Sequence, residues 1–309
     1  KLSCLAALIF FRGVNMKSKS LERKYKIAGW YFVMPASLLI FLFSFIPMVR
    51  AFILSLQSGV GNNLSFCGIK NYVRLFQDEK FIASLKNVII YFAFQVPIML
   101  FIAIILACIL NDKKLKFKGL FRTIIFLPCA TSLVASALIF KSLFALDGLV
   151  NVLLLNHHFI SQPINWLTHP VWAKVIVIFT ITWRWTGYNT VFFLAGLQGI
   201  EYSIYEAARI DGASTVQTFF RITLPQLKPV VLLTAIMSTN GTLQLFDEVK
   251  NLTGGGPGNA TITISQYIYD LSFKYNPQFG YAAAVSYAIL IIVALLSFVQ
   301  IILADRKEK

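Results

Sequence analysis

Six long apolar stretches, separated by polar connections, dominate the pattern of the chain. About 20 helical residues cross the roughly 30 Å hydrocarbon core of a bilayer, and helices satisfy their own backbone groups there. The fifth stretch is the shortest, and Asn240-Gly241 interrupts it, so we expect a break in the helix at that point. The stretches cover residues 27–48, 88–110, 123–144, 171–197, 230–246 and 281–303. The pattern predicts an all-α integral membrane protein with six transmembrane helices.

Composition agrees with this prediction. Charged residues make up 13% of the chain and hydrophobic residues 57%, whereas soluble domains are about 25% charged. The net charge of +15 suggests a nucleic-acid partner at first sight. The basic residues lie between the apolar stretches, however, and not along one stripe, so no nucleic acid is expected. The four cysteines are too few and too scattered to predict a disulfide framework.

The distribution of Lys and Arg predicts the orientation. The N-terminal segment, the second-to-third and fourth-to-fifth connections and the tail carry 18 of these residues, and the opposite side carries 7. Cytoplasmic loops hold the excess of positive charge, so both termini are predicted to lie in the cytoplasm. The expected organisation is a basic cytoplasmic segment (1–26), a six-helix membrane domain (27–303) and a cytoplasmic tail (304–309).

The first residues are treated separately. Residues 2–11 are apolar but too short to span a bilayer, and they do not form a signal peptide with a basic start and a small-residue cleavage site. Met16, followed by Lys-Ser-Lys-Ser, resembles a natural start. We therefore expect residues 1–15 to be an upstream extension, with a short interfacial helix as the alternative.

The cytoplasmic connection between the fourth and fifth stretches, residues 199–229, predicts two short helices set at an angle. Residues 201–210 are good helix formers. Gly212 suits the position after a helix end, where a left-handed backbone is needed. Ser214 or Thr215 can then cap the second helix by accepting from its free N–H groups.

Pro225 and Pro229 are expected to end this second helix before the fifth span. The small side chains of Ala207 and Ala208 would allow another helix to approach closely, and Glu206 offers a carboxylate beside them. The pair also has an apolar face. Composition alone leaves two readings open: the pair docks into a cleft of another protein, or it lies on lipid. The residues of the apolar face are Ile210, Val216, Phe219, Phe220 and Ile222.

The same segment resembles the permease subunits of binding-protein-dependent ABC importers. Their loop pattern is Glu-Ala-Ala, three residues, Gly, nine residues, Ile, one residue and Leu-Pro. This chain matches every gap, with Glu206-Ala207-Ala208, Gly212, Ile222 and Leu224-Pro225. It departs from many relatives at Glu201, where they have Pro. Further matches, at 66–72, 121–122, 127–128 and 252–261, are similar to the carbohydrate branch, which includes maltose, lactose and glycerol-phosphate importers.

The resemblance implies specific partners and a location. Glu206, Ala207, Ala208 and Gly212 would couple the chain to a cytoplasmic ATPase present in two copies. A second homologous permease and an extracytoplasmic solute-binding protein would complete the assembly in a bacterial plasma membrane. The chain lacks the phosphate-binding Gly-x-x-x-x-Gly-Lys-Ser/Thr pattern. ATP and Mg²⁺ are therefore expected on the partner, with no cofactor or metal bound by this chain.

Polar residues inside the predicted spans are candidates for a solute path, because each is costly in lipid. In the fourth span these candidates are Arg184, Tyr188 and Asn189, and in the fifth they are Asn240 and Gln244. Aromatic faces beside hydrogen-bonding groups suit a sugar. The alternative is that these side chains only pack and pair within the helix bundle.

Two other classes compete with an importer subunit. A secondary transporter driven by an ion gradient usually carries acidic or histidine relays within its spans, and the six predicted spans contain no Asp or Glu. An enzyme would need a catalytic constellation, and none is visible. The sequence therefore predicts a non-enzymatic subunit of an ATP-driven oligosaccharide importer, without naming the sugar.

Overall fold

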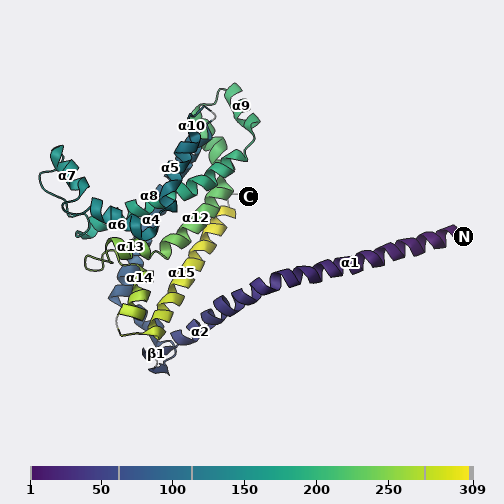
Figure 1. The fold of residues 1–309 in the computed structure, drawn as a ribbon, viewed down its shortest axis with the longest axis horizontal. Helices are drawn as coiled ribbons and strands as arrows, with labels where there is room; N and C mark the ends of the chain where they lie inside the picture. Colours follow the sequence, from purple (N-terminus) through teal and green to yellow (C-terminus); the bar gives the residue numbers. More distant parts are fainter. Residues whose placement is uncertain (1, 62, 113, 275, 306–309) are drawn as a thin grey trace. The chain divides into compact units, whose positions relative to one another are not determined.

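The computed structural model describes residues 2–61, 63–112, 114–274 and 276–305, and most of this part is helical (Figure 1). The chain divides between Leu54 and Ser55 into two compact units. The first unit is a long helical segment made of α1 (Leu2–Ile40), the π-helical η1 (Phe41–Phe45) and most of α2 (Ile46–Ser55). Its section Leu21–Ser55 is long and apolar enough to cross a membrane, and no residue of its most apolar window is buried. The predicted first span lies within this section.

The second unit holds the remaining described elements, with one antiparallel hairpin at its start and helices after it. Residues Gln57 and Phe66 pair in register in that hairpin. The elements are β1 (Gln57–Val60), β2 (Asn63–Phe66), α3 (Lys70–Leu75), α4 (Glu79–Asn111), α5 (Lys118–Ala130), α6 (Leu133–Leu143), α7 (Leu149–Asn156), α8 (Pro170–Gln198), α9 (Tyr202–Ile210), α10 (Thr215–Thr218), η2 (Phe219–Thr223), α11 (Leu224–Gln226), α12 (Lys228–Leu243), α13 (Asp247–Leu252), α14 (Ile264–Tyr269), η3 (Asp270–Lys274) and α15 (Phe279–Asp305).

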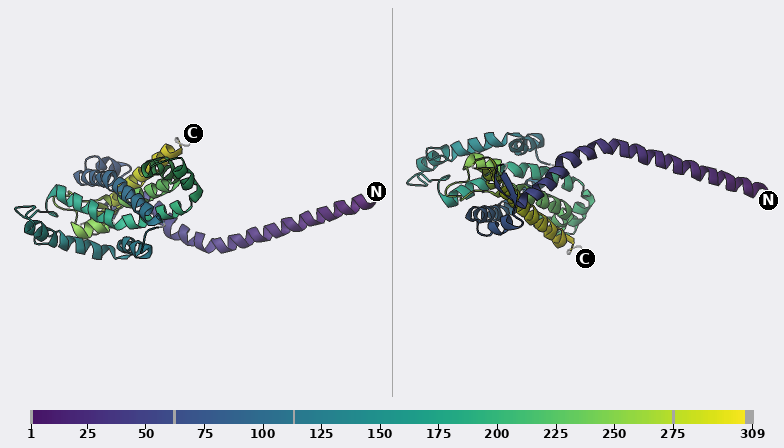
Figure 2. Two further views of the ribbon diagram at one scale, coloured as in Figure 1. Left: turned by 90° about the horizontal axis from the view of Figure 1, so that it is seen from above. Right: turned by 90° about the horizontal axis from the view of Figure 1, so that it is seen from below.

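The core of this unit forms where α8 packs along α4, and α12 packs against both. Small residues of α4, Ala103 and Ala107, are fully buried in the same cluster as Phe193 of α8 and Leu227 before α12. The absence of bulky side chains at the alanines lets the two long helices approach each other. α12 and α15 also run side by side in the second unit (Figures 1 and 2).

Three helices in the described ranges are long and apolar enough to cross a membrane: Leu21–Ser55, Glu79–Asn111 and Phe279–Leu303. Two bent helix pairs raise that number to five if each pair counts as one span. The helix at the predicted fourth span, α8, has 29 residues but is not among them. Its Lys174, Arg184 and Asn189 lower its hydropathy. The number of six spans, the orientation and the domain boundaries at 26 and 303 therefore stay predictions.

The predicted third span, 123–144, is two helices and not one. The axes of α5 and α6 differ in direction by 97°, with the break at Thr131 and Ser132. Pro128 lies inside the last turn of α5 and removes one backbone donor. The apolar composition of this stretch did not reveal the bend, because both halves have the same hydrophobic pattern.

The helix break predicted at Asn240-Gly241 is wrong in position. Both residues lie inside α12, and the helix ends at Leu243. Phe246 then has a non-helical backbone (φ −138°, ψ −65°), and α13 begins after it. The carbonyl of Leu245 accepts a hydrogen bond from Thr263 Oγ1 at 2.7 Å, so a residue 18 positions away stabilises the break. A glycine inside a helix weakens it by about 1 kcal/mol, which the packing of α12 against α4 and α15 offsets.

Gly187 lets α5 and α8 touch through their backbones. A Cβ atom at Gly187 would lie 2.0 Å from the carbonyl oxygen of Ile125 in α5, far inside van der Waals contact. The pair of helices therefore crosses with no side chain between them at this point.

The start of α4 is fixed by Asp78, which lies at the N-cap. Its Oδ1 accepts from the backbone N–H groups of Lys80 at 2.9 Å and Phe81 at 3.2 Å. Its Oδ2 accepts from the hydroxyls of Tyr267 at 2.5 Å and Tyr281 at 2.6 Å. One carboxylate thus holds together the beginnings of α4 and α15 and the short helix α14.

Asp78 predicts a pH-dependent contribution to stability. Burial raises the pKa of this carboxyl, but the four hydrogen bonds together lower it more, so its pKa lies below the usual value. An acid with a lowered pKa in the folded state stabilises the fold above its unfolded pKa of about 3.9. That contribution is lost as the pH falls through the folded pKa.

We expect Asp78→Asn to lower the melting temperature in detergent clearly at pH 7, and the difference from wild type to shrink below about pH 4. The control is Glu79→Gln, at the exposed neighbouring position, which should leave the melting temperature near wild type at pH 7. If the melting temperature of Asp78→Asn stays below that of wild type by the same amount down to pH 2, the carboxylate of Asp78 does not stabilise the fold in this way.

Candidate functional site

The helix pair predicted between the fourth and fifth spans is present as α9 and α10. The N–H of Gly212 donates to the carbonyl of Arg209 at 3.1 Å, and that of Ala213 donates to Ala208 at 2.9 Å. These two bonds form a Schellman motif, and Gly212 has the left-handed φ of +75° that the motif needs. The prediction that Gly212 occupies the left-handed position after a helix end is confirmed.

The second helix begins as predicted at Ser214. Its Oγ accepts from the N–H of Gln217 at 3.3 Å, and the side chain of Gln217 accepts in return from the N–H of Ser214 at 2.9 Å. This is a complete capping box. The segment Thr215–Gln226 then bends by 68° before α12, between Pro225 and Pro229. The angle between α9 and α10 is therefore set by local bonds on both sides of Gly212.

The pair presents a projecting surface. Glu206 and Ala207 are exposed, whereas Ala208 is buried on the inner side of α9. Ile210 is 86% exposed, which is high for an apolar residue. Among the other members of the predicted apolar face, Val216 and Phe220 are exposed, while Phe219 and Ile222 are half-buried. In Figure 1, α9 and α10 lie at the end of the second unit away from β1.

A contact beneath this surface ties the pair to the rest of the unit. The hydroxyl of Tyr205 in α9 lies 3.3 Å from Oγ1 of Thr223, a buried residue of η2. A force applied to α9 would therefore be passed to the helical segment that leads into α12.

A cavity of about 590 Å³ opens between α4, α8, α12 and α13. Small-molecule sites usually measure about 300–1,000 Å³, so the cavity has room for a solute. Its lining mixes apolar and polar side chains: Gln95, Met99, Leu133, Ile181, Trp185, Tyr188, Asn189, Met237, Ser238, Gly241, Thr242, Gln244, Leu245, Phe246, Asp247 and Glu248.

Three of the five predicted path residues line this cavity: Tyr188, Asn189 and Gln244. Asn189 is buried; its amide nitrogen donates to the carbonyl of Trp185 at 3.0 Å, and its oxygen accepts from Ser238 Oγ at 3.4 Å. Gln95 Oε1 accepts from Thr242 Oγ1 at 2.8 Å. Asn240 is half-buried and is not among the lining residues.

Arg184 is also absent from the lining, because its guanidinium is directed at the break between α5 and α6. Nη1 donates to the carbonyl of Pro128 at 3.1 Å and to Ser136 Oγ at 3.2 Å. Nη2 donates to the carbonyl of Thr131 at 2.8 Å. The geometry places this buried cation as a clamp on the bend, where helical hydrogen bonds are missing.

Glu248 is a lining residue that sequence reasoning did not identify. It follows the predicted fifth span, and α13 packs back against α8. Its Oε1 accepts from the indole N–H of Trp185 at 3.4 Å. No pattern in the sequence signals this fold-back.

The fold and these sites agree with a known family. The model of the family described as "binding-protein-dependent transport system inner membrane component" matches residues 83–309. The chain belongs to this family. It is therefore a membrane component of a transport system, and not an enzyme of the kinds considered above.

Curated relatives of this permease are similar over nearly their whole length. The lactose transport system permease protein of Rhizobium radiobacter is 54% identical over 291 residues, which cover 94% of this chain and 98% of the relative. The arabinooligosaccharides transport system permease protein of Bacillus subtilis is 33% identical over 279 residues, covering 89% and 88%.

A solved structure shares the fold of the permease. It belongs to a bacterial ABC transporter involved in the import of the acidic polysaccharide alginate, and one of its chains superimposes with a TM-score of 0.79. The identity is 24%, with coverage of 94% of this chain and 99% of that chain. A second structure of an alginate transporter, in complex with an alginate-bound periplasmic protein, gives a TM-score of 0.76.

Proposed function

We propose that this permease is one of two homologous membrane subunits of an ATP-driven importer for oligosaccharides in the bacterial plasma membrane. In this proposal it has six spans with both termini in the cytoplasm, and it forms half of the solute path. The observation that carries the proposal is the exposed α9–α10 pair with its Glu-Ala-Ala…Gly pattern. The pair projects from the fold and is anchored to α12 through η2 and α11.

The helix pair suits docking into a cleft of an ATPase better than contact with lipid. Ala207 has no bulky side chain and is exposed beside the carboxylate of Glu206. Interfacial helices carry mostly Lys and Arg on their polar face, whereas the exposed charges here include the carboxylates of Glu206 and Asp211, which favours a protein groove. ATP and Mg²⁺ would bind to that partner and not to this chain.

The solute is proposed to be an oligosaccharide for two reasons. The relatives named above transport lactose and arabinooligosaccharides according to their names. The cavity also combines the aromatic side chains of Trp185 and Tyr188 with the amides of Asn189 and Gln244. Aromatic faces can stack on the C–H faces of a sugar while amides pair with its hydroxyls. An extracytoplasmic binding protein would deliver the sugar.

A mild-detergent purification of the tagged chain from its native membranes, followed by mass spectrometry, tests the assembly. We expect a nucleotide-binding ATPase and a second, similar permease to copurify. Glu206→Lys should reduce the recovered ATPase at least tenfold while the second permease stays bound. Glu79→Lys, an exposed carboxylate outside the helix pair, is the matched control and should retain the ATPase.

Recovery of the chain alone, or only with copies of itself, would contradict the importer proposal. An ion-driven carrier that works without partners would then be the function to test, by measuring whether uptake persists after ATP depletion.

A further inference from the structure

An acidic helix end closes one side of the cavity. α13 begins with Asp247 and Glu248, and both residues line the cavity. Glu248 is 6% exposed and lies beside Trp185, in the middle of α8. A carboxylate is thus brought to a depth where the sequence pattern predicted only neutral side chains and Arg184.

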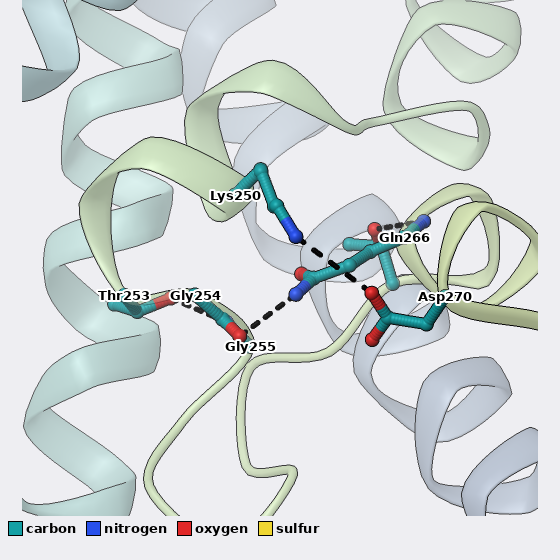
Figure 3. A network of polar contacts seen from close by, with 7 residues as sticks. Lys250, Thr253, Gly254, Gly255, Gln266 and Asp270 are labelled. Atoms are coloured by element: carbon teal, nitrogen blue, oxygen red, sulfur yellow. Dashed lines mark hydrogen bonds and ion pairs between the residues drawn. The ribbon is translucent and has the colours of Figure 1, made fainter. Parts of the chain in front are cut away.

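The position of α13 is fixed from its far side. Nζ of Lys250 lies 3.7 Å from the buried Oδ1 of Asp270 in η3, and Gln266 Nε2 donates to the carbonyl of Gly254 at 2.7 Å. Figure 3 shows these two contacts side by side, joining the end of α13 to α14 and η3. Because the ammonium of Lys250 is directed at Asp270, it faces away from Glu248 on the same short helix. The acidic end is therefore held against the cavity without a cation of its own helix beside it.

The charges around the cavity have one sign. Of the sixteen lining residues in the described part of the chain, two are acidic and none is Lys, Arg or His. The nearest cation on α8, Arg184, donates to the carbonyls of Pro128 and Thr131 and to Ser136. Its charge partly offsets that of Glu248, but its N–H groups are directed at the α5–α6 break and do not line the cavity.

We propose that Glu248, together with Asp247, makes this cavity select neutral saccharides and reject acidic ones. This inference rests on the proposed oligosaccharide function. The hydroxyl of a neutral sugar donates to the Glu248 carboxylate, and a charge-assisted hydrogen bond of this kind is stronger than a neutral one. A sugar carboxylate offers no donor and adds a negative group beside the two acidic side chains of the lining. It must either face that repulsion or force the protonation of Glu248, and both lower its affinity.

The transporter with the similar fold differs in the charge of its solute. That transporter is described as importing an acidic polysaccharide, and the two chains share the fold at 24% identity. The same scaffold can therefore serve solutes of opposite character only if the lining side chains differ. Glu248 is the residue of this chain whose charge opposes an acidic solute most directly.

Tryptophan fluorescence of the purified assembly in nanodiscs tests this selection. Trp185 lines the cavity, so a bound saccharide should change its emission, and Trp185→Phe identifies that part of the signal. The probes are lactose and its uronic acid analogue, in which the C6 hydroxyl of the galactose unit is oxidised to a carboxylate. We expect the acid to bind at least tenfold more weakly than lactose at pH 7 and 50 mM salt. Glu248→Gln and Asp247→Asn/Glu248→Gln should each reduce that ratio, the double variant to about threefold or less.

The control variant is Glu79→Gln, which removes an exposed carboxylate distant from the lining residues in sequence and should leave the ratio unchanged. If Glu248→Gln does not fold, Asp247→Asn alone carries the test with a smaller expected reduction. Equal affinity of the wild type for both probes, or an unchanged ratio in the folded variants, would overturn charge selection and leave the oligosaccharide function standing. A lack of response to either probe would overturn both.

Discussion

Gly212→Val is expected to abolish uptake while leaving the permease in the membrane at near wild-type amount. The residue has a φ of +75°, and no atom lies within 4 Å of a Cβ built there, so the cost is backbone strain and not a clash. A left-handed backbone costs an L-residue about 1–2 kcal/mol, and a β-branched side chain raises that cost. The Schellman motif would open, and α10 would leave its fixed angle to α9. Uptake of a labelled oligosaccharide that the wild-type assembly transports measures the effect, with membrane content determined by immunoblot.

A graded series sharpens this prediction. Gly212→Ala, which carries the smaller strain, should retain partial uptake. Gly119→Val is the matched control, because Gly119 is exposed in α5, does not have a positive φ and has no atom near its Cβ position. Wild-type uptake by Gly212→Val would remove α9–α10 as the coupling element, and equal loss in Gly119→Val would show that the effect is not specific to the motif.

Arg184→Ala is expected to lower the melting temperature of the permease by roughly 5–15 °C. The substitution removes the charged donor to the carbonyls of Pro128 and Thr131 and to the hydroxyl of Ser136. The carbonyl of Pro128 keeps the hydroxyl of Thr131 at 2.7 Å as a donor, so the main loss is at the carbonyl of Thr131. Each hydrogen bond from a charged donor contributes about 1.5–3 kcal/mol, and a buried acceptor left unpaired is costly. The bend between α5 and α6 would lose its fixed angle. Thermal unfolding in detergent, monitored by circular dichroism, measures the effect.

The same variant separates the two roles considered for this residue. A clamp on the bend predicts a large loss of stability, with Arg184→Lys in between because an ammonium cannot reach three separated acceptors in the same way. A residue of the solute path would instead change the substrate range or the solute-stimulated ATPase activity with little loss of stability. Arg122→Ala, at an exposed position of α5, controls for the removal of an arginine and should shift the melting temperature by no more than about 1–2 °C.

Local features of the fold could be predicted from the sequence. The turn at Gly212 and the cap at Ser214 depend on neighbours within five residues, so the side chains there determine the backbone directly. The apolar stretches likewise located α4, α8 and α15 to within a few residues at most ends, although α4 begins at Glu79, nine residues before the predicted span.

Features that depend on distant partners could not be predicted. The backbone carbonyls at the bend between α5 and α6 receive hydrogen bonds from Arg184, which lies more than 50 positions away in the chain. The end of α12 depends on Thr263, and its break was expected three residues too early because Gly241 is a helix breaker only when packing does not oppose it. Glu248 reaches the cavity as a result of that later break. A charge pattern read along the chain could not place it beside Trp185.

The backbone contact at Gly187 limits how the permease can move. Two helices that touch through side chains can slide past each other, because the side chains can change rotamer. At Gly187 the backbone of α8 contacts the backbone of α5 directly, and no side chain there can change rotamer to permit sliding. Arg184, one turn earlier on α8, binds the end of α5 as well. We therefore expect α5 and α8 to behave as one rigid body during the transport cycle. The rearrangement between inward- and outward-open states would then have to take place outside this pair, at the 68° bend before α12.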